Sequence, residues 1–320
     1  MKLKQIFEDR ELHFGLPQSS GNMIVIPIIS ELDINDVSSD MMFNITNDSD
    51  YAHLTLKNDD ELPVIVPQGT AYMNKQSAQD RVILSANVIG KQAKRVNVGC
   101  IESGQCGHMK VGTEEERYLS ATLRGAAMDK DTGARHSQYG VIWDDIEKFN
   151  RKLNVSGRSH IRDFYEKFQN DLEFNIGQFE IVENQIGAII IINNKIAGIK
   201  IYPNRESWNK VWRKLLRDSY LADALALTTL GKALQFRPMI DVDKVNSIED
   251  LETQTSEILI SHNENMMSII EPVIDITTTK DSFDNQLGFS ISNFLVKELR
   301  GQIVEKENKV MYLTAVAKVV

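Results

Sequence analysis

Short apolar runs separated by polar turns dominate the first third of the chain. Residues 23–29 (MIVIPII) form a continuous apolar run, and residues 62–69 (LPVIVPQG) end in a proline and a glycine that stop a strand. Two further runs follow, 82–89 (VILSANVI) and 96–102 (VNVGCIE). Short runs bounded by turn residues are typical of antiparallel sheets. The pattern therefore predicts a β-rich part built as a sandwich or an open barrel.

The second half contains the clearest local signals of a hairpin and a helix. Residues 186–192 and 196–202 are β-branched runs joined through two asparagines, which tolerate the positive φ of tight turns. Apolar residues then recur every three or four positions, which predicts an amphipathic helix over about residues 205–227. The last run, IVEKENKVMYLTAV, predicts a terminal hairpin that turns near residues 307–309.

Three segments between these elements are predicted from weaker signals. The start of 114–127 (EEERYLSATLRGAA) is compatible with a helix, and the polar stretch 128–138 that follows has no periodicity. Residues 43–47 (FNITN) and 52–58 (AHLTLKN) alternate between apolar and polar, as strands do. Between residues 30 and 50, the acidic, Ser/Asn-rich stretches ELDINDVSSD and NDSD are expected to be surface loops, as is the polar stretch 277–286.

These patterns together predict an α+β fold. We expect a β-rich antiparallel sandwich or open barrel in residues 1–125. A second, α+β subdomain in residues 126–320 would hold the hairpin 186–202, the amphipathic helix and the terminal hairpin. A chain of 320 residues allows either one large core or two medium ones.

The composition limits which partners and which cellular compartment we expect. The net charge of -9 argues against a nucleic-acid partner, because nucleic-acid binding depends on neutralising phosphates. The longest apolar runs fall well short of the ~20 residues that a membrane span requires, so no membrane association is expected. The amino terminus has no signal-peptide pattern, and only Cys100 and Cys106 are present. Both features predict a cytoplasmic protein without disulfides.

The two cysteines invite a zinc interpretation that the spacing supports poorly. Cys100, Cys106 and His108 form C-x5-C-x-H, whereas structural zinc normally takes four ligands in tighter pairs. Cys100 is more simply a small buried side chain of a strand. The common hydrolase, zinc-protease and phosphate-loop motifs do not occur in the sequence. We therefore expect neither a metal nor a cofactor.

Polar side chains gather beside the strands of residues 67–106. Gln79, Asp80 and Arg81 come directly before one strand, and Glu102 ends the next. Arginine and glutamine at a strand end suit recognition of a carboxylate, a phosphate or an amide. The alternative is a salt bridge between Arg81 and Glu102 that only pins the loops. The residues alone leave both interpretations open.

The same residues resemble a known, poorly characterised family. It is the domain named for its association with ADP-ribosylglycohydrolase and rhodanese/phosphatase proteins. The resemblance is carried by three elements: Pro67, Gly69 and Thr70; Gln79, Asp80 and Arg81; and Cys100, Glu102 and Gly104. Gln138, Trp143 and the segment 187–225 resemble its later elements. Where the family has Arg-Trp after the glycine, this chain has Gln105 and Cys106, a departure that bears on activity.

The resemblance implies an accessory role beside ADP-ribose metabolism without a transferable reaction. Our first hypothesis is a ligand-binding or enzyme-like module for a small anionic molecule, such as a nucleotide or an ADP-ribose derivative. Arg81 would bind the anion, Gln79 would orient a polar group, and Glu102 would position Arg81 or act as a general base. The candidate ligand-binding residues are Gln79, Asp80, Arg81, Glu102, Gly69 and Gly104. The alternative is a non-enzymatic interaction protein that assembles into a homo-oligomer.

Overall fold

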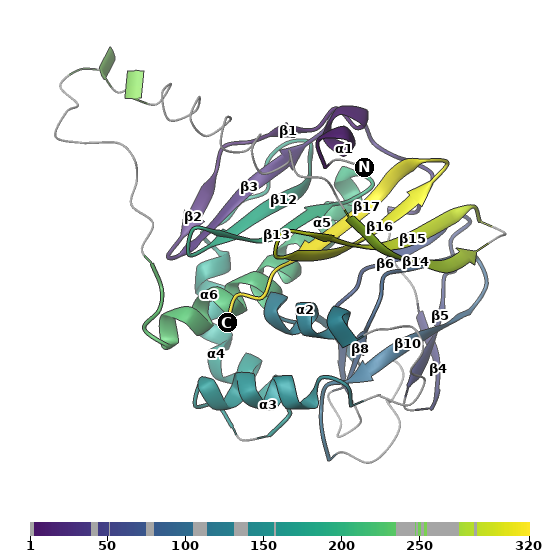
Figure 1. Cartoon of the computed structure of the whole chain (residues 1–320), viewed down its shortest axis with the longest axis horizontal. Coiled ribbons are helices and arrows are strands. Elements are labelled where there is room, and N and C mark those ends of the chain that lie inside the picture. The colour runs from purple at the N-terminus through teal and green to yellow at the C-terminus, as the bar shows by residue number, and fades with distance from the viewer. Residues whose placement is uncertain are drawn as a thin grey trace.

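The chain combines helices with antiparallel sheets, which confirms the predicted α+β class (Figure 1). The computed structural model describes residues 3–39, 44–50, 52–74, 80–104, 114–130, 140–156, 158–234, 247, 249–250, 253–254, 275–284 and 287–320. None of the helices in these ranges is long and apolar enough to cross a membrane.

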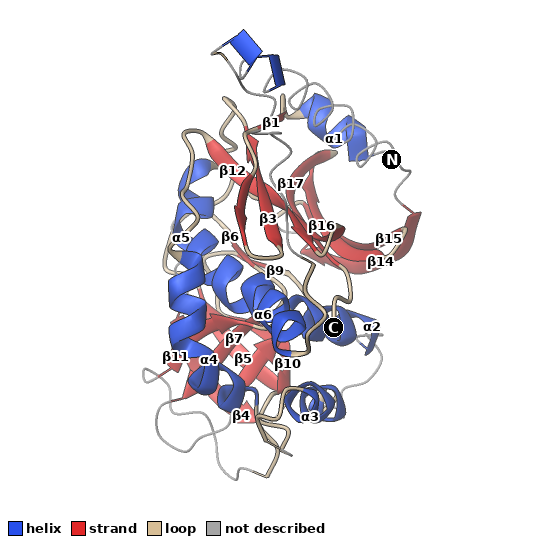
Figure 2. Cartoon of the chain, turned by 90° about the vertical axis from the view of Figure 1, so that its left-hand side faces the viewer, coloured by secondary structure: helices blue, strands red, loops and turns tan. Residues whose placement is uncertain are grey.

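A nine-stranded antiparallel sheet, which we call the large sheet, forms one layer of the molecule. Its order is β1-β3-β12-β13-β17-β16-β15-β14, with β2 paired to β3. The strands are β1 (His13–Phe14), β2 (Gln18–Ser20), β3 (Met23–Ile29), β12 (Gln185–Ile192), β13 (Lys195–Ile201), β14 (Asp275–Asp284), β15 (Phe289–Val296), β16 (Leu299–Lys306) and β17 (Lys309–Val316). The sheet is strongly curved (Figure 2). It combines strands from both sides of the predicted boundary at residue 125.

Both predicted hairpins are confirmed, and both turn through residues with positive φ. Asn193 and Asn194 have φ of 50° and 60° between β12 and β13. Glu307 and Asn308 have φ of 52° and 62° between β16 and β17. This left-handed geometry matches the twist of the flanking strands and asparagine tolerates it well, which explains why the turns were recognisable in the sequence.

A second, six-stranded antiparallel sheet, the small sheet, has the order β11-β7-β8-β10-β5-β4. Its strands are β4 (Asn44–Asp50), β5 (His53–Lys57), β7 (Thr70–Asn74), β8 (Arg81–Ile83), β10 (Lys94–Cys100) and β11 (Glu114–Tyr118); β6 (Val64–Val66) and β9 (Asn87–Ile89) pair separately. In Figure 2 the small sheet lies below the large sheet, with α2 and α6 at the level between them.

Three predictions about local structure were wrong. Residues 114–118 form strand β11 rather than a helix, because they pair in register with β7. Residues 47–50, which were expected in a loop, continue the strand expected over 43–47 and complete β4 beside β5. Residues 275–284 form β14 beside β15, where a loop was expected over 277–286. Each of these polar segments takes its strand conformation from a partner strand, which its own residue pattern does not reveal.

Apart from α1, the described helices lie on the side of the large sheet that faces the small sheet (Figure 2). The helices are α1 (Leu3–Asp9), α2 (Ala121–Lys130), α3 (Trp143–Lys152), α4 (Ile161–Ile176), α5 (Arg205–Leu215), the π-helix η1 (Leu216–Leu221) and α6 (Ala222–Thr229). Only α1 packs on the opposite face, where Leu3 and Ile6 join the apolar cluster of Ile199 and Leu313. The main core contains Trp208 from α5 and residues of α4, η1 and the large sheet.

The predicted amphipathic helix over about 205–227 is confirmed as one continuous helical stretch with a π-helix in its middle. It begins after Asn204, whose side chain accepts a hydrogen bond from Ser207 N at 2.9 Å. The π-helix carries Asp218, which accepts from Tyr118 N at 3.4 Å, and is followed by Asp223, which accepts from Thr122 N at 2.8 Å. The two aspartates thus join this helix to the segment between β11 and α2.

Candidate functional site

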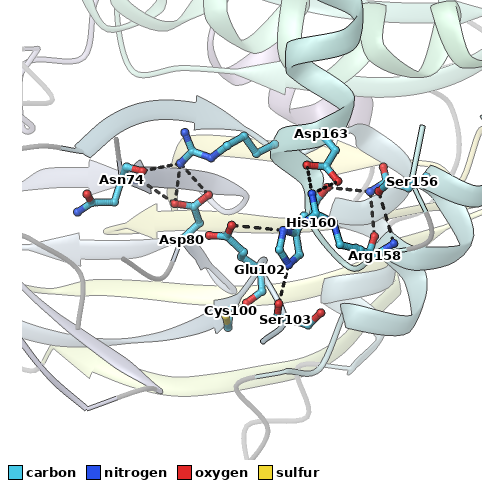
Figure 3. A network of polar contacts seen from close by, with 11 residues as sticks. Asn74, Asp80, Cys100, Glu102, Ser103, Ser156, Arg158, His160 and Asp163 are labelled. Carbon is cyan, nitrogen blue, oxygen red and sulfur yellow. Dashed lines mark hydrogen bonds and ion pairs between the residues drawn. The ribbon is translucent and has the colours of Figure 1, made fainter. Parts of the chain in front are cut away.

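Polar side chains of the small sheet meet the residues that lead into α4. A short backbone pairing brings them together: Glu102 forms an isolated antiparallel bridge with His160, and Ser103 N donates to Ser159 O at 3.2 Å. We call Asp80, Glu102, His160 and Arg162 the Asp80–Glu102 cluster. Figure 3 shows the Glu102 carboxyl pointing toward the His160 ring, with Asp80 beside it.

The contacts of His160 fix where its proton lies. His160 Nε2 is 2.6 Å from the carbonyl oxygen of Ser103, and a carbonyl only accepts, so Nε2 carries hydrogen and donates. Nδ1 lies 3.4 Å from Glu102 Oε1. A hydrogen bond between these two atoms requires a proton on either the Glu102 carboxyl or Nδ1.

Burial favours the neutral, protonated form of the Glu102 carboxyl. Its residue is 5% exposed. Burial, and secondarily the charge of Asp80, raises the Glu102 pKa to about 7, while Arg162 acts against the shift. A carboxyl with this pKa exchanges its proton readily near neutral pH, which is the property required of a general acid or base.

Asp80 is held by backbone and guanidinium donors. Its carboxylate accepts from Asn74 N at 2.7 Å, and from Arg162 Nη2 at 2.9 Å and 3.0 Å. Burial raises the Asp80 pKa, and Arg162 and the Asn74 amide oppose that rise. Arg162 Nη2 also donates to Asn74 O at 2.7 Å. Arg162 thus ties the end of β7 to the residue before β8.

Two arginines line the accessible side of the cluster. The side chain of Arg162 is 26% exposed, and that of Arg158 is 63% exposed. Arg158 Nη2 donates to both oxygens of Asp163 at 3.1 Å (Figure 3). Toward described residues, Arg162 donates only through Nη2, so its Nε and Nη1 groups face no protein acceptor there.

The candidate residues divide between this cluster and other places. Asp80 and Glu102 lie in it together, as expected for a shared site. Arg81 begins β8 with no exposed surface, and its Nη1 is 3.5 Å from Asp80 O. Gln79 lies outside the described residues, and the Arg81–Glu102 salt bridge stays a prediction.

Gly69 and Gly104 share a backbone conformation but have different surroundings. Their φ angles are 82° and 80°. A Cβ built on Gly69 would lie 2.4 Å from Arg124 Nε, whereas one on Gly104 would meet no described heavy atom within 4 Å. Gly69 therefore makes room for the Arg124 side chain of α2, and Gly104 follows Ser103 at the edge of the Asp80–Glu102 cluster.

Sequence reasoning missed the partners contributed by residues 156–163. The segment SGRSHIRD places Arg158, His160 and Arg162 at alternate positions just before a helix. That alternation of basic residues was the available signal. It was overlooked because candidate site residues were sought only beside the strands of residues 67–106.

The thiol of Cys100 plays a structural part in this arrangement. Cys100 is buried, and its Sγ donates to Glu102 O at 3.1 Å. Burial raises the Cys100 pKa, which disfavours the reactive thiolate. In the described ranges no group of three or more His, Cys, Asp or Glu side chains is placed to hold a metal ion. Gln105, Cys106 and His108 lie outside the described residues.

Comparison with known proteins identifies one family. No curated protein and no solved structure matches the chain significantly. The family described as ARG and Rhodanese-Phosphatase-superfamily-associated Protein domain (ARPP-1) matches residues 11–267, which include the small sheet, part of the large sheet and the whole Asp80–Glu102 cluster. Because this match covers well over half of the 320 residues, the chain belongs to the ARPP-1 domain family.

Proposed function

We propose that the Asp80–Glu102 cluster binds a small anionic molecule, of the nucleotide or ADP-ribose type, and that Glu102 transfers a proton within it. The observation that carries the proposal is the contact of 3.4 Å between Glu102 Oε1 and His160 Nδ1, which lies beside two arginines. Burial raises the pKa of Glu102 to about 7, which suits a group that transfers a proton at neutral pH.

The arginines supply the anion recognition. Arg162 is oriented by Asp80 through Nη2, which leaves Nε and Nη1 as donors for phosphate or carboxylate oxygens. Arg158 is more exposed and would contribute at the rim, held by Asp163. In this arrangement Arg81, which is buried, supports the backbone of Asp80 from beneath the site.

Proton transfer is the chemical step that the pair can perform. With the proton on Glu102, the carboxyl acts as a general acid toward a leaving oxygen of the ligand. With the proton on His160 Nδ1, the Glu102 carboxylate acts as a general base toward a water or a hydroxyl. His160 passes between these two states without moving, because Ser103 O keeps its ring fixed.

The test is thermal unfolding of the protein with ADP-ribose, ADP, AMP and inorganic phosphate, in the wild type and two arginine variants. Arg158→Ala removes the exposed donor of the cluster. Arg151→Ala is the matched control, since Arg151 is 69% exposed and pairs with Glu147 on its own helix. We expect at least one ligand to raise the wild-type Tm, with its Kd weakened about tenfold by Arg158→Ala.

Arg151→Ala should retain wild-type affinity in the same assay. The proposal fails if no ligand in the panel raises the Tm, or if Arg158→Ala and Arg151→Ala bind equally well. Glu102→Gln separates binding from chemistry, since it should keep the affinity for the ligand while abolishing any turnover detected with the wild type.

A second candidate function is assembly into a homo-oligomer. It is favoured by large apolar side chains on the surface, of which Phe174 is 72% exposed and Leu16 is 65% exposed. Exposed apolar residues of this size are common contacts between subunits. Mass measurement in solution decides it: a defined oligomer that Phe174→Ser dissociates supports this function, and a monomer at all concentrations contradicts it.

A further inference from the structure

Two fully buried cations converge on one hydroxyl group between the large sheet and α2. Arg124 Nη2 donates to Thr314 Oγ1 at 3.0 Å, and Lys200 Nζ donates to the same oxygen. All three residues have no exposed surface. Thr314 of β17 lies directly opposite Lys200 of β13 in the sheet, so the backbone register itself brings lysine and hydroxyl together.

The acceptors around these cations are neutral. Arg124 Nε donates to Gln68 Oε1 at 3.1 Å, its Nη2 donates to Gln68 O at 2.9 Å, and its Nη1 lies 3.4 Å from Ser219 Oγ. In the described part of the chain, neither Arg124 nor Lys200 forms an ion pair with a carboxylate. Buried charge without a counter-charge is costly, by several kcal/mol for an ammonium group.

The acidic residue of the neighbouring helix is engaged elsewhere. The Asp223 carboxylate accepts from Thr122 N at 2.8 Å and from Thr122 Oγ1 at 3.0 Å. The pKa of Lys200 is lowered well below its ordinary value, by burial first and by the charge of Arg124 second, with no opposing acid. Among the described residues, no carboxylate contacts Arg124 or Lys200, so a positive charge on these two side chains has no counter-charge there.

Four buried tyrosine hydroxyls surround the cations. They belong to Tyr118, Tyr202, Tyr220 and Tyr312, and none makes a hydrogen bond of ordinary geometry to a described residue. Lys200 Nζ lies 5.8 Å from the ring centroid of Tyr220, and the rings of Tyr202 and Tyr312 are 5.1 Å apart. Each phenol oxygen can accept as well as donate, but a phenol carries no negative charge, so the cluster offers Arg124 and Lys200 only neutral acceptors.

We propose that these residues, the Arg124–Lys200 cluster, form an internal binding site for a small inorganic anion of the halide or phosphate class. Such an anion supplies the negative charge that the two cations lack and the acceptor that the remaining ammonium and phenol protons lack. Binding occurs at the junction of the large sheet, α2 and η1. The anion stabilises that junction, and its site is separate from the Asp80–Glu102 cluster.

Bromide is the direct probe, because it replaces small anions and scatters anomalously. Crystals of the wild-type protein soaked in sodium bromide should show an anomalous peak within hydrogen-bond distance of Lys200 Nζ. Bromide sites on the surface but none in the cluster would overturn the proposal, since the lysine would then be accommodated as a neutral amine without an anion.

Thermal unfolding at fixed ionic strength gives an independent test. Sodium chloride and sodium phosphate should each be compared with sodium gluconate, whose anion is too large for a closed site. We expect chloride or phosphate to raise the wild-type Tm above its value in gluconate. Lys200→Met should remove this difference, and Lys195→Met, in the same strand but exposed, should keep it.

Tyr220→Phe provides a milder variant if Lys200→Met does not fold. Loss of one phenol donor should weaken the anion response several-fold while leaving the fold intact, because the ring remains. An equal Tm in all three salts for the wild type, or an unchanged anion response in both Lys200→Met and Tyr220→Phe, would refute the site. The salt that gives the larger shift identifies whether the anion is a halide or an oxyanion.

Discussion

The pKa of Glu102 shows how the fold changes a property of a single residue. A glutamate at a strand end is normally ionised at neutral pH, yet here burial and the nearby Asp80 charge raise its pKa to about 7. The bridge to His160 places its carboxyl beside the imidazole ring. The raised pKa of Glu102 and its contact with His160 are therefore consequences of the fold around it.

This pKa predicts a stability change with pH. Below about pH 4.5 folded and unfolded chains both bind the Glu102 proton; between about 4.5 and 7 only the folded chain does. The free energy of unfolding therefore falls as pH rises through this window, by on the order of 2 kcal/mol after allowance for solvent screening. Urea unfolding of wild type and Glu102→Gln at pH 5 and pH 8 measures the difference.

Asp223 serves as the control for this experiment. Burial raises its pKa to about 7 as well, so it adds a similar fall in stability over the same range. Glu102→Gln should remove only part of the wild-type pH dependence, and Asp223→Asn should remove another part. A wild type that becomes more stable from pH 5 to pH 8, or a Glu102→Gln variant with the full wild-type dependence, would contradict the assignment.

The sequence predicted individual site residues only in part. Asp80 and Glu102 were identified because they interrupt an apolar strand pattern, which is a local signal. His160 and Arg162 were not, because their contacts depend on a backbone pairing between segments about 58 residues apart in the chain. The full burial of Arg81 likewise follows from the packing of the small sheet rather than from its neighbours in sequence.

At the scale of elements, the turn before β7 and helix α2 are fitted to each other. The Arg124 side chain crosses Gly69 so closely that a methyl group there would lie 2.4 Å from Nε. Arg124 is also held by Gln68 and Thr314, so it has little freedom to move away. The Arg124 side chain thereby connects the turn between β6 and β7 to the large sheet.

Gly69→Ala should accordingly be far more disruptive than Gly104→Ala. Both changes place an alanine at a φ near 80°, which costs about 1 kcal/mol. Only Gly69→Ala adds the clash with Arg124, which we expect to bring its cost to about 3 kcal/mol. Chemical denaturation of the two variants measures this, and equal losses of unfolding free energy would show that Arg124 is not fixed as described.

Elements with strong local signals were predicted well, and elements that depend on partners were not. The two hairpins were recognisable from paired runs and turn residues, and the helix from its apolar spacing. The end of β4 and strand β14 were predicted as loops and β11 as the start of a helix, since backbone pairing with β5, β15 and β7 decides their conformation. The π-helix inside the long helical stretch leaves no trace in a 3.6-residue periodicity.

On the scale of the whole molecule, the large sheet extends beyond the family match. The match ends at residue 267, whereas β17 lies between β13 and β16 in the centre of the sheet. Residues after 267 contribute Tyr312 and Thr314 to the interior beside Lys200. The structural unit of this chain therefore includes its last strands.

A chain that stops at residue 267 should not fold stably. Truncation at residue 267 would remove β17, expose the edge of β13 and uncover the buried Lys200 and Tyr202. We expect loss of solubility and of a cooperative thermal transition, measured by circular dichroism. Removal of only Val319 and Val320, which donate to Thr122 through their backbone, should leave the transition in place. A cooperative transition with the wild-type Tm in the shorter chain would disprove this view.

The π-helix η1 sets how two carboxylates are spaced around one helix. Asp218 and Asp223 are five positions apart, the spacing of one π-helical turn, and they hold the amides of Tyr118 and Thr122. The same residues wound as an ordinary α-helix would place Asp223 about 140° around the axis from Asp218, because each residue turns by about 100°. Asp223 could then not reach Thr122 while Asp218 holds Tyr118. The π-helical turn thus accommodates one extra residue, and a related chain that lacks one residue of 219–221 should form an ordinary helix with both aspartates on the same side.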